Sequence, residues 1–388
     1  MRRMRVVVAL LAVLAGCTSF RSAMPGPMGE LLRPPAAARK IRVALSLAAP
    51  SASVRVSGPG MVYDRDKRVR LSRFPVLNDS MIRAGRGSIE MSGRTLGSRR
   101  ISIIPDMPQS LWVNGILYRG IVDFVADPDG SLTVVNTVPL DDYLMGVVPK
   151  ETFAAWPDAA LRAQAVAARS FAVYHIRHYA KPDYDIIAPT HQLYGGVSAE
   201  DPRTSRAVLD TQNEVVTYRG DVLCTYFHTC CGGRTEDAWN VFPSMTVYPA
   251  GVVSHYDTDS PHAVWHHSMA AIACAEKLRL AGKGVSGPVT RVTDIERTSG
   301  GRVARLRFVT AGGSASVSGI ECRQILGNDR LRSTWFDVTV QGGQIEFIGR
   351  GWGHGVGLCQ WCSRGMANRG FSCEQILGHF YPGAELHR

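Results

Sequence analysis

From about residue 41 to residue 135, short segments of alternating apolar and polar residues follow one another along the chain. Gly, Asn and Asp residues separate the segments, and alternation with a period of two indicates half-buried strands. The clearest turn signal is Asp127-Pro128-Asp129-Gly130, which predicts a hairpin. We therefore expect residues 41–135 to form a β-rich module. Its segments read IRVALSLA, SVRVSG, GMVYD, ISIIP, LWVNGILYRG, IVDFVA and SLTVVN.

The pattern changes after residue 135. The apolar pair Val147-Val148 looks strand-like and runs into Pro149, Lys150 and Glu151. A helix is predicted next, from about residue 157 to residue 179, because Pro157 suits the first helical turn and Asp158 complements its positive end. Small apolar residues recur along this stretch at helical spacing and would let another element approach closely. They are Leu161, Ala165, Ala168 and Ala172.

A strand-like residue pattern returns beyond residue 210, in NEVVTYRGDVLCTYFH. The later stretch VARLRFVTAGGSASVSG suggests a further hairpin. At 388 residues the chain is long enough for more than one folded unit. The predicted fold class is α+β, with a β-rich N-terminal module followed by a mixed α/β domain over residues 136–388.

The first residues read as an export signal. MRRMR is basic, VVVALLAVL is a short apolar run, and LAGC closes it, which predicts a signal peptide over residues 1–16. Leu14-Ala15-Gly16-Cys17 matches the lipobox of bacterial lipoproteins, so Cys17 is the expected lipidation site and residues 17–40 the tether. Because Thr18 rather than Asp follows the cysteine, an outer-membrane, periplasmic location is expected in a bacterium with two membranes.

Net charge narrows the choice of partner. The formal charge of +11 favours an anionic partner such as nucleic acid, phospholipid or an acidic wall polymer. Export argues against nucleic acid, so the wall and the membrane remain.

Eight cysteines remain when Cys17 is assigned to the anchor. An even number in an oxidising compartment is compatible with disulfides. The vicinal Cys230-Cys231 and the CxxC of Cys359 and Cys362 could also gather around zinc. Because a second CxxC is missing, we favour disulfides or free thiols, and we expect no metal.

Three clusters carry candidate chemistry. The first is Glu151 with Gln164 and Arg169, the second is YFHTCCGGRTEDAW at residues 226–239, and the third is the glycine-rich GRGWGHGVGLCQWCSRGMA at residues 349–367. Each also has a structural interpretation: Glu151 as a first-turn carboxylate with Arg169 as its ion-pair partner, and the two loops as turns and crossings. A P-loop lysine, a GxSxG elbow and an HExxH helix are absent from the sequence, which disfavours the corresponding nucleotide, esterase and metalloprotease sites.

Together the clusters resemble the stage II sporulation protein D (SpoIID/LytB) family of cell-wall enzymes and amidase enhancers. The resemblance runs from about residue 113 to the C-terminus, with a variable stretch near residues 275–340. The motifs that carry it are VPLDDYLMGVVPKE, ALRAQAVAARSFAVY, HQLYGG, YFHTCCGGRTEDAW, YDTDSP, GRGWGHGVGLCQW and ILGHFYPG.

The resemblance implies a SpoIID-like catalytic domain with a glycan-binding groove and Glu151 as the catalytic acid. A lytic transglycosylase needs one carboxyl, because the C6 hydroxyl of muramic acid is an internal nucleophile, whereas hydrolases usually need two. Glu151 should therefore be partly buried with a raised pKa. The implied substrate-binding residues are Arg169, Gln192, Tyr194, His228, Tyr248, His354 and Gln360.

Three departures from the family pattern matter. Ala250 stands where a basic residue often follows Tyr248 by two positions, which favours a binding protein over an enzyme. Zinc-binding members of the family carry cysteines just before a Q-x-Y segment, which here is Gln192-Leu193-Tyr194. Those cysteines are missing from this chain, so the resemblance implies no metal. Cys359 replaces a small polar residue, and a disulfide to Cys230 or Cys231 is implied if the two loops meet.

The leading expectation is thus a lipid-anchored, exported lytic transglycosylase that cleaves MurNAc-GlcNAc β-1,4 bonds of peptidoglycan strands and leaves 1,6-anhydroMurNAc ends. The alternative is a non-catalytic glycan-binding protein that enhances an amidase. The resemblance also implies an N-acetylmuramoyl-L-alanine amidase as a candidate partner, with no cofactor.

Overall fold

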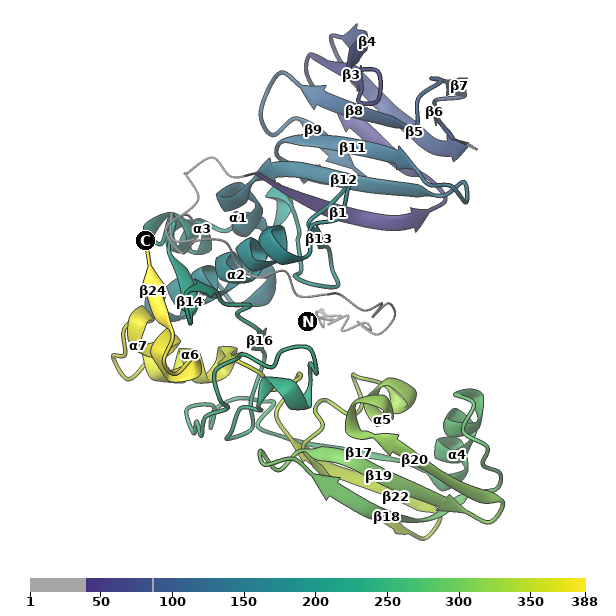
Figure 1. Cartoon of the computed structure of the whole chain (residues 1–388), viewed down its shortest axis with the longest axis vertical. Coiled ribbons are helices and arrows are strands. Elements are labelled where there is room, and N and C mark those ends of the chain that lie inside the picture. Colours follow the sequence, from purple (N-terminus) through teal and green to yellow (C-terminus); the bar gives the residue numbers. More distant parts are fainter. Residues whose placement is uncertain (1–39, 86) are drawn as a thin grey trace, which may run out of the picture. The chain divides into compact units, whose positions relative to one another are not determined.

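A computed structural model describes residues 40–85 and 87–388 (Figure 1). The predicted signal peptide, the lipidation site Cys17 and the tether up to residue 39 lie outside the described residues. The chain divides into two compact units. The N-terminal unit comprises the described residues up to Cys224 together with Leu386–Arg388, and the C-terminal unit comprises Thr225–Glu385. The predicted domain of residues 136–388 is therefore not one unit.

A β-sandwich forms the first part of the N-terminal unit. A seven-stranded sheet has the order β13-β1-β12-β11-β8-β3-β4, and a six-stranded sheet has the order β10-β9-β2-β5-β6-β7. Apolar residues of both sheets, such as Val54 and Phe124, are buried in a shared core, as the alternation predicted. The strands are β1 (Lys40–Ala49), β2 (Ala52–Val56), β3 (Gly60–Asp64), β4 (Val69–Phe74), β5 (Leu77–Gly85), β6 (Ser88–Met91), β7 (Arg94–Thr95), β8 (Arg100–Pro105), β9 (Leu111–Val113), β10 (Ile116–Tyr118), β11 (Ile121–Ala126), β12 (Leu132–Pro139) and β13 (Ile186–Ile187).

The predicted hairpin at Asp127-Gly130 is confirmed. Ala126 of β11 pairs with Leu132 of β12, and the N–H of Gly130 donates to the carbonyl of Asp127 at 3.0 Å. Gly130 has a φ of 84°, which a residue without Cβ adopts at little cost. The module does not stop at residue 135, because β12 continues to Pro139 and leads directly into the first helix.

Three helices complete the N-terminal unit: α1 (Leu140–Glu151), α2 (Asp158–His178) and α3 (Pro202–Asp210), which pack on one another (Figure 1). The predicted 157–179 helix is confirmed as α2, with Pro157 and Tyr179 as its caps. The strand-like interpretation of Val147-Val148 was wrong. Both lie in α1, because Leu140, Tyr143, Leu144 and Val147 recur at helical spacing and are buried together.

Short elements close this unit. A three-stranded sheet has the order β15-β14-β24, and the predicted strands in NEVVTYRGDVLC are confirmed by its first two members. The elements are the 3-10 helix η1 (Val197–Ala199), β14 (Val215–Tyr218), β15 (Asp221–Val222) and β24 (Glu385–His387). Within the described residues, no helix is both long enough and apolar enough to cross a bilayer.

Two three-stranded sheets, β17-β22-β21 and β18-β19-β20, share a core with two helices in the C-terminal unit. The predicted hairpin in VARLRFVTAGGSASVSG is confirmed as β19 and β20. A separate parallel pair, β16-β23, joins the two motif-bearing loops. The elements are β16 (Phe227–His228), η2 (Ala238–Asn240), β17 (Val264–Ala270), α4 (Ala271–Leu280), β18 (Val289–Arg297), β19 (Val303–Thr310), β20 (Gly313–Ser318), α5 (Gly319–Leu326), β21 (Phe336–Gln341), β22 (Gln344–Arg350), β23 (Leu358–Cys359), α6 (Gln360–Ala367) and α7 (Cys373–Phe380).

Candidate active site

Glu151 is the last residue of α1 and is half-buried. Burial raises the pKa of its carboxyl from 4.5 to about 7, although the N–H of Leu193 and the charge of Lys150 act in the opposite direction. The free carbonyls at a helix C-terminus also disfavour a negative charge there. The predicted raised pKa is confirmed. The alternative that Glu151 complements the start of α2 is wrong, because residues 152–157 separate it from that helix.

A backbone group of the HQLYGG segment holds this carboxyl. The N–H of Leu193 donates to Oε1 of Glu151 at 2.7 Å. Gln192, which is 1% exposed, fixes the segment: its Oε1 accepts from the hydroxyl of Tyr143 at 3.0 Å and its Nε2 donates to the carbonyl of Ala168 at 3.1 Å. Because both ends of its amide are engaged, Gln192 positions the segment, whereas we had predicted that it binds substrate.

Tyr194 holds the other side of the same segment. Its ring centroid lies 4.8 Å from that of Tyr143, and its hydroxyl donates to Oδ1 of Asn136 at 3.0 Å. The close approach requires Gly146 in α1, because a Cβ there would lie 2.7 Å from the Tyr194 ring. Burial raises the pKa of Tyr194 above its ordinary value, so its hydroxyl stays protonated. We had predicted a substrate contact, and the structure gives Tyr194 a positioning role.

Arg169 was predicted to contact substrate beside the catalytic carboxyl, but it is 2% exposed and has other partners. Its Nη2 lies 3.2 Å from Oδ1 of Asp141 in α1 and 2.9 Å from the carbonyl of Val208 in α3. Its Nη1 lies 3.3 Å from Oγ1 of Thr211 and 3.4 Å from the carbonyl of Glu214. Arg169 therefore ties α2 to α1 and α3, and the prediction of a substrate-binding role is not supported.

An aromatic residue near Glu151 was missed by the sequence analysis. Phe153 is 54% exposed, and its ring centroid lies 5.5 Å from that of the buried Trp156. Arg203 fixes this loop by donating to the carbonyls of Ala154 at 2.8 Å and Trp156 at 3.0 Å. The loop thus presents a supported aromatic face two residues after the carboxyl. The sequence did contain a signal for this residue, because Phe153 lies between the candidate acid Glu151 and the Pro157-Asp158 helix start.

The two predicted histidines lie in the C-terminal unit, on the joined loops. Nε2 of His354 lies 2.9 Å from the carbonyl of Phe227, and its Nδ1 accepts from the N–H of Val356 at 3.0 Å. Nδ1 of His228 lies 3.1 Å from the carbonyl of Val356. Burial lowers the pKa of each histidine to about 4, so both rings are neutral at pH 7. Their contacts make them loop-crossing residues, contrary to the predicted sugar contacts.

Tyr248 and Gln360 are also largely buried in this unit, at 7% and 6% exposure. The hydroxyl of Tyr248 accepts from the N–H of Tyr226 at 3.1 Å. Gln360 is the first residue of α6. Ala250, at the position of the missing basic residue, is exposed.

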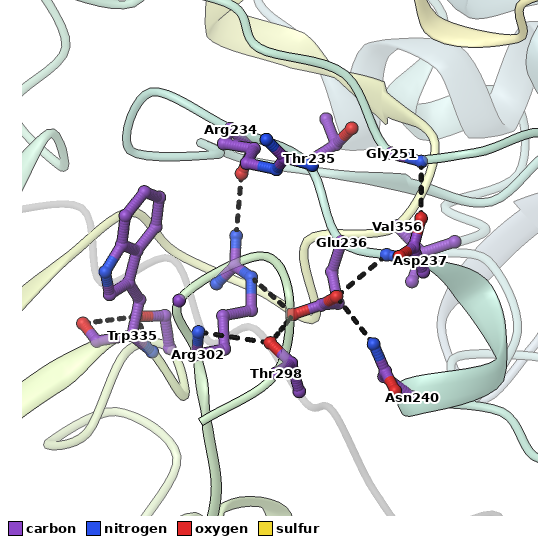
Figure 2. Close-up of polar contacts among 12 residues, drawn as sticks. Arg234, Thr235, Glu236, Asp237, Asn240, Gly251, Thr298, Arg302, Trp335 and Val356 are labelled. Atoms are coloured by element: carbon purple, nitrogen blue, oxygen red, sulfur yellow. Dashed lines mark hydrogen bonds and ion pairs between the residues drawn. The ribbon is translucent and has the colours of Figure 1, made fainter. Parts of the chain in front are cut away.

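A buried glutamate of the C-terminal unit, Glu236, has several hydrogen-bond partners (Figure 2). Oε1 accepts from the N–H of Asp237 and from Nδ2 of Asn240, each at 2.9 Å, and Oε2 accepts from Oγ1 of Thr298 at 2.5 Å. Nε of Arg302 lies 3.9 Å from the same Oε2. Glu236 is thus held by several donors, whereas the Glu151 side chain has one hydrogen bond among the described residues and a carboxyl that can exchange a proton near pH 7.

The predicted disulfides among Cys230, Cys231, Cys359 and Cys362 are not formed, and these four residues are thiols. The two loops do meet, as expected. However, Sγ of Cys231 lies 3.6 Å from Sγ of Cys362, well beyond the roughly 2.05 Å of a disulfide bond.

Two family models match the chain, one within each compact unit. Residues 128–218 match the model of the stage II sporulation protein family (SpoIID), and residues 254–357 match a domain of unknown function (DUF8618). An uncharacterized protein of Brachyspira hyodysenteriae is 28% identical over 89% of this chain and 92% of its own length. The stage II sporulation protein D of Bacillus amyloliquefaciens is 29% identical over 65% of this chain and 75% of its own length.

A third relative is the amidase enhancer of Bacillus subtilis, which is 27% identical over 63% of this chain and 40% of its own length. The family model covers β12, α1, α2, α3 and β14, which are the elements around Glu151. The predicted resemblance is confirmed: residues 128–218 carry a SpoIID domain, and the chain is similar to proteins named stage II sporulation protein D and amidase enhancer.

Proposed function

We propose that this protein is a peptidoglycan lytic transglycosylase in which Glu151 is the acid and then the base. Relatives named for sporulation and for amidase enhancement support a cell-wall role. The observation that carries the proposal is the Glu151 carboxyl, which burial keeps protonated up to about pH 7 and which the N–H of Leu193 holds in place.

The reaction begins with proton transfer from Glu151 to the glycosidic oxygen between C1 of MurNAc and O4 of GlcNAc. The C1–O4 bond breaks, and GlcNAc leaves with the proton on O4. The resulting carboxylate is stabilised by the Leu193 N–H and accepts the proton of the MurNAc C6 hydroxyl. The C6 oxygen then bonds to C1, which yields the 1,6-anhydro end, restores the protonated carboxyl and consumes no water.

The loop after α1 supplies a surface for the glycan. Phe153 is exposed while its ring rests against Trp156, so its free face can stack on a sugar ring at little cost in side-chain freedom. Denuded strands are the proposed substrate, export and a lipid anchor at Cys17 are the proposed location, and the excess of basic residues would favour an acidic wall or membrane surface.

The test compares wild type with Glu151→Gln on denuded glycan strands, with mass spectrometry of the products. Glu346→Gln is the matched control, because Glu346 is an exposed residue of β22 in the other unit. We expect anhydromuramyl products from wild type and Glu346→Gln but not from Glu151→Gln. Products from Glu151→Gln at the wild-type rate would refute the role of Glu151.

The second candidate function is a glycan-binding enhancer of an N-acetylmuramoyl-L-alanine amidase. The similarity to an amidase enhancer and Ala250 at the position of a basic residue favour it. In that case wild type and Glu151→Gln would both bind strands and both raise the rate of the amidase, and neither would release anhydromuramyl ends.

A further inference from the structure

Four buried ligand atoms gather in the C-terminal unit. They belong to Cys231, Asp257, Cys359 and Cys362, and all lie within 4.8 Å of one another. The three cysteines are 0% exposed and Asp257 is 4% exposed. The residues come from three chain segments: the turn after β16, the loop before β17, and the junction of β23 with α6. None of them is used by the proposed reaction.

The spacing of these atoms is that of a coordination shell. A zinc–sulfur bond is about 2.3 Å, so the edge of a tetrahedron around zinc is about 3.8 Å. Sγ of Cys231 lies 3.6 Å from Sγ of Cys362 and 3.4 Å from Oδ2 of Asp257. Both distances are close to that edge, and the sulfur–sulfur distance is far from that of a bonded pair.

Backbone donors surround the sulfur of Cys359. The N–H of Cys231 lies 3.2 Å from it and the N–H of Cys362 lies 3.4 Å from it. Hydrogen bonds from the backbone to sulfur orient a metal-binding thiolate and stabilise its charge. The CxxC pair is placed by α6, in which Cys359 is the N-cap.

The carboxylate of Asp257 lies against the turn that carries Cys230 and Cys231. Its Oδ2 accepts from the N–H of Gly232 at 2.9 Å, and Sγ of Cys230 lies 3.0 Å from the same oxygen. These neutral donors do not balance the charge of a buried carboxylate. Two buried arginines of this unit are engaged elsewhere: Arg302 directs its Nη2 to the carbonyl of Cys231 at 3.0 Å and has Glu236 as its ionic partner, and Arg323 donates to the carbonyls of Leu331 and Arg332.

His228, which lies beside the cluster, has a buried ring nitrogen without a hydrogen-bond partner among the described residues. This nitrogen is Nε2, while Nδ1 faces the carbonyl of Val356 at 3.1 Å. This arrangement places the proton on Nδ1 and leaves the Nε2 lone pair free. The side chain of Cys231 interacts with the His228 ring.

We propose that Cys231, Cys359, Cys362 and Asp257 bind a zinc ion. Three thiolates and one carboxylate are a donor set suited to a borderline-soft divalent cation in tetrahedral coordination. Four protein ligands leave no open position, so the ion is structural and clamps the three segments together. The sequence analysis had favoured no metal because a second CxxC is missing, but Cys231 and Asp257 replace it from elsewhere in the chain.

The test measures zinc in the purified full-length chain, prepared anaerobically without chelator, by elemental mass spectrometry. Cys359→Ala/Cys362→Ala removes two ligands. Cys274→Ala/Cys322→Ala is the matched control, because it removes two buried thiols from the separate core of the same unit. We expect about one zinc per chain in wild type and control, and a near-complete loss in the ligand variant. Asp257→Asn should weaken zinc binding by roughly tenfold or more.

A second measurement does not depend on how the variants fold. Cobalt(II) added to the zinc-free wild-type chain should give thiolate-to-cobalt charge-transfer absorption and the visible bands of a tetrahedral site. The proposal is overturned if wild type binds neither zinc nor cobalt under reducing conditions. It is also overturned if the four cysteines of the two loops are found in disulfides in the purified protein, or if the ligand variant retains its zinc.

Discussion

The N–H of Leu193 donates a 2.7 Å hydrogen bond to Oε1 of Glu151, from a position 42 residues later in the chain. This bond favours the charged carboxylate, while burial favours the protonated form more strongly and raises the pKa to about 7. The two effects together suit a group that must first donate a proton and then accept one. In the proposed reaction the Gln192-Leu193-Tyr194 segment therefore acts through its backbone, while its side chains hold it against α1 and α2.

The pH dependence of activity should report the Glu151 carboxyl. Because the protonated form is the acid, kcat/KM on denuded strands should fall above pH about 7, by about tenfold per pH unit. The measurement is the initial rate of anhydromuramyl release at low substrate across the pH range. An activity that declines from the ordinary glutamate range, near pH 4 to 5, would contradict the raised pKa.

Folding stability should depend on pH through the same residue. The folded-state pKa of Glu151 is about 7, above the 4.5 of an exposed glutamate, so the unfolded state ionises first. Stability therefore decreases as pH rises from about 4.5 to 7, and this loss is absent in Glu151→Gln. Relative to their difference at pH 4, the variant should gain about 3 kcal/mol over wild type at pH 8.

Denaturant unfolding of both proteins at the two pH values measures this gain. Glu346→Gln is the control, since it alters an exposed glutamate of the other unit and should follow wild type at both pH values. A Glu151→Gln difference that is the same at pH 4 and pH 8 would show that the carboxyl is not perturbed.

Arg169 should matter for stability rather than for substrate affinity. Arg169→Met removes the buried cation that ties α2 to Asp141 and α3, at a cost of about 3 kcal/mol. Arg177→Met in the same helix is the control, because its ion pair with the exposed Asp221 should contribute less than about 1 kcal/mol. Thermal unfolding and KM, measured where both variants are folded, separate the two roles. A raised KM without loss of stability would restore the substrate contact that we rejected.

Phe153 should contribute to glycan binding. Phe153→Ala removes an exposed ring supported by Trp156, so KM for strands should rise about threefold to tenfold while the melting temperature stays close to that of wild type. Phe153→Tyr keeps a stacking face and should bind normally. Equal KM values for wild type and Phe153→Ala would remove Phe153 from the site.

Local patterns predicted the elements whose signals are local. The sandwich strands follow from alternation, the β11–β12 hairpin from Asp127-Gly130, and α2 from its small residues at helical spacing. The helix α1 was missed because Val147-Val148 before Pro149 looks like a strand when read alone. The segment is helical because the face that includes Leu140 and Leu144 is buried by tertiary packing, which a local pattern does not reveal.

The sequence indicated which residues to consider for the site, but it did not indicate what each side chain contacts. Glu151 was identified, and its raised pKa was expected, yet its place at the end of a helix was not. Sequence cannot show that Arg169 is paired with Asp141, or that both ends of the Gln192 amide are engaged. The gathering of Cys231, Cys359 and Cys362 around Asp257 could not be predicted, because the CxxC pair lies more than one hundred positions from the other two residues and only the fold brings them together.

The most direct test of the central claim is digestion of denuded strands in water labelled with heavy oxygen, followed by mass spectrometry of the new ends. Intramolecular attack by the C6 hydroxyl predicts 1,6-anhydroMurNAc ends that carry no label, from wild type but not from Glu151→Gln. Reducing MurNAc ends that carry heavy oxygen would show attack by water, and strands left intact by wild type would show a binding protein; either result would contradict the account.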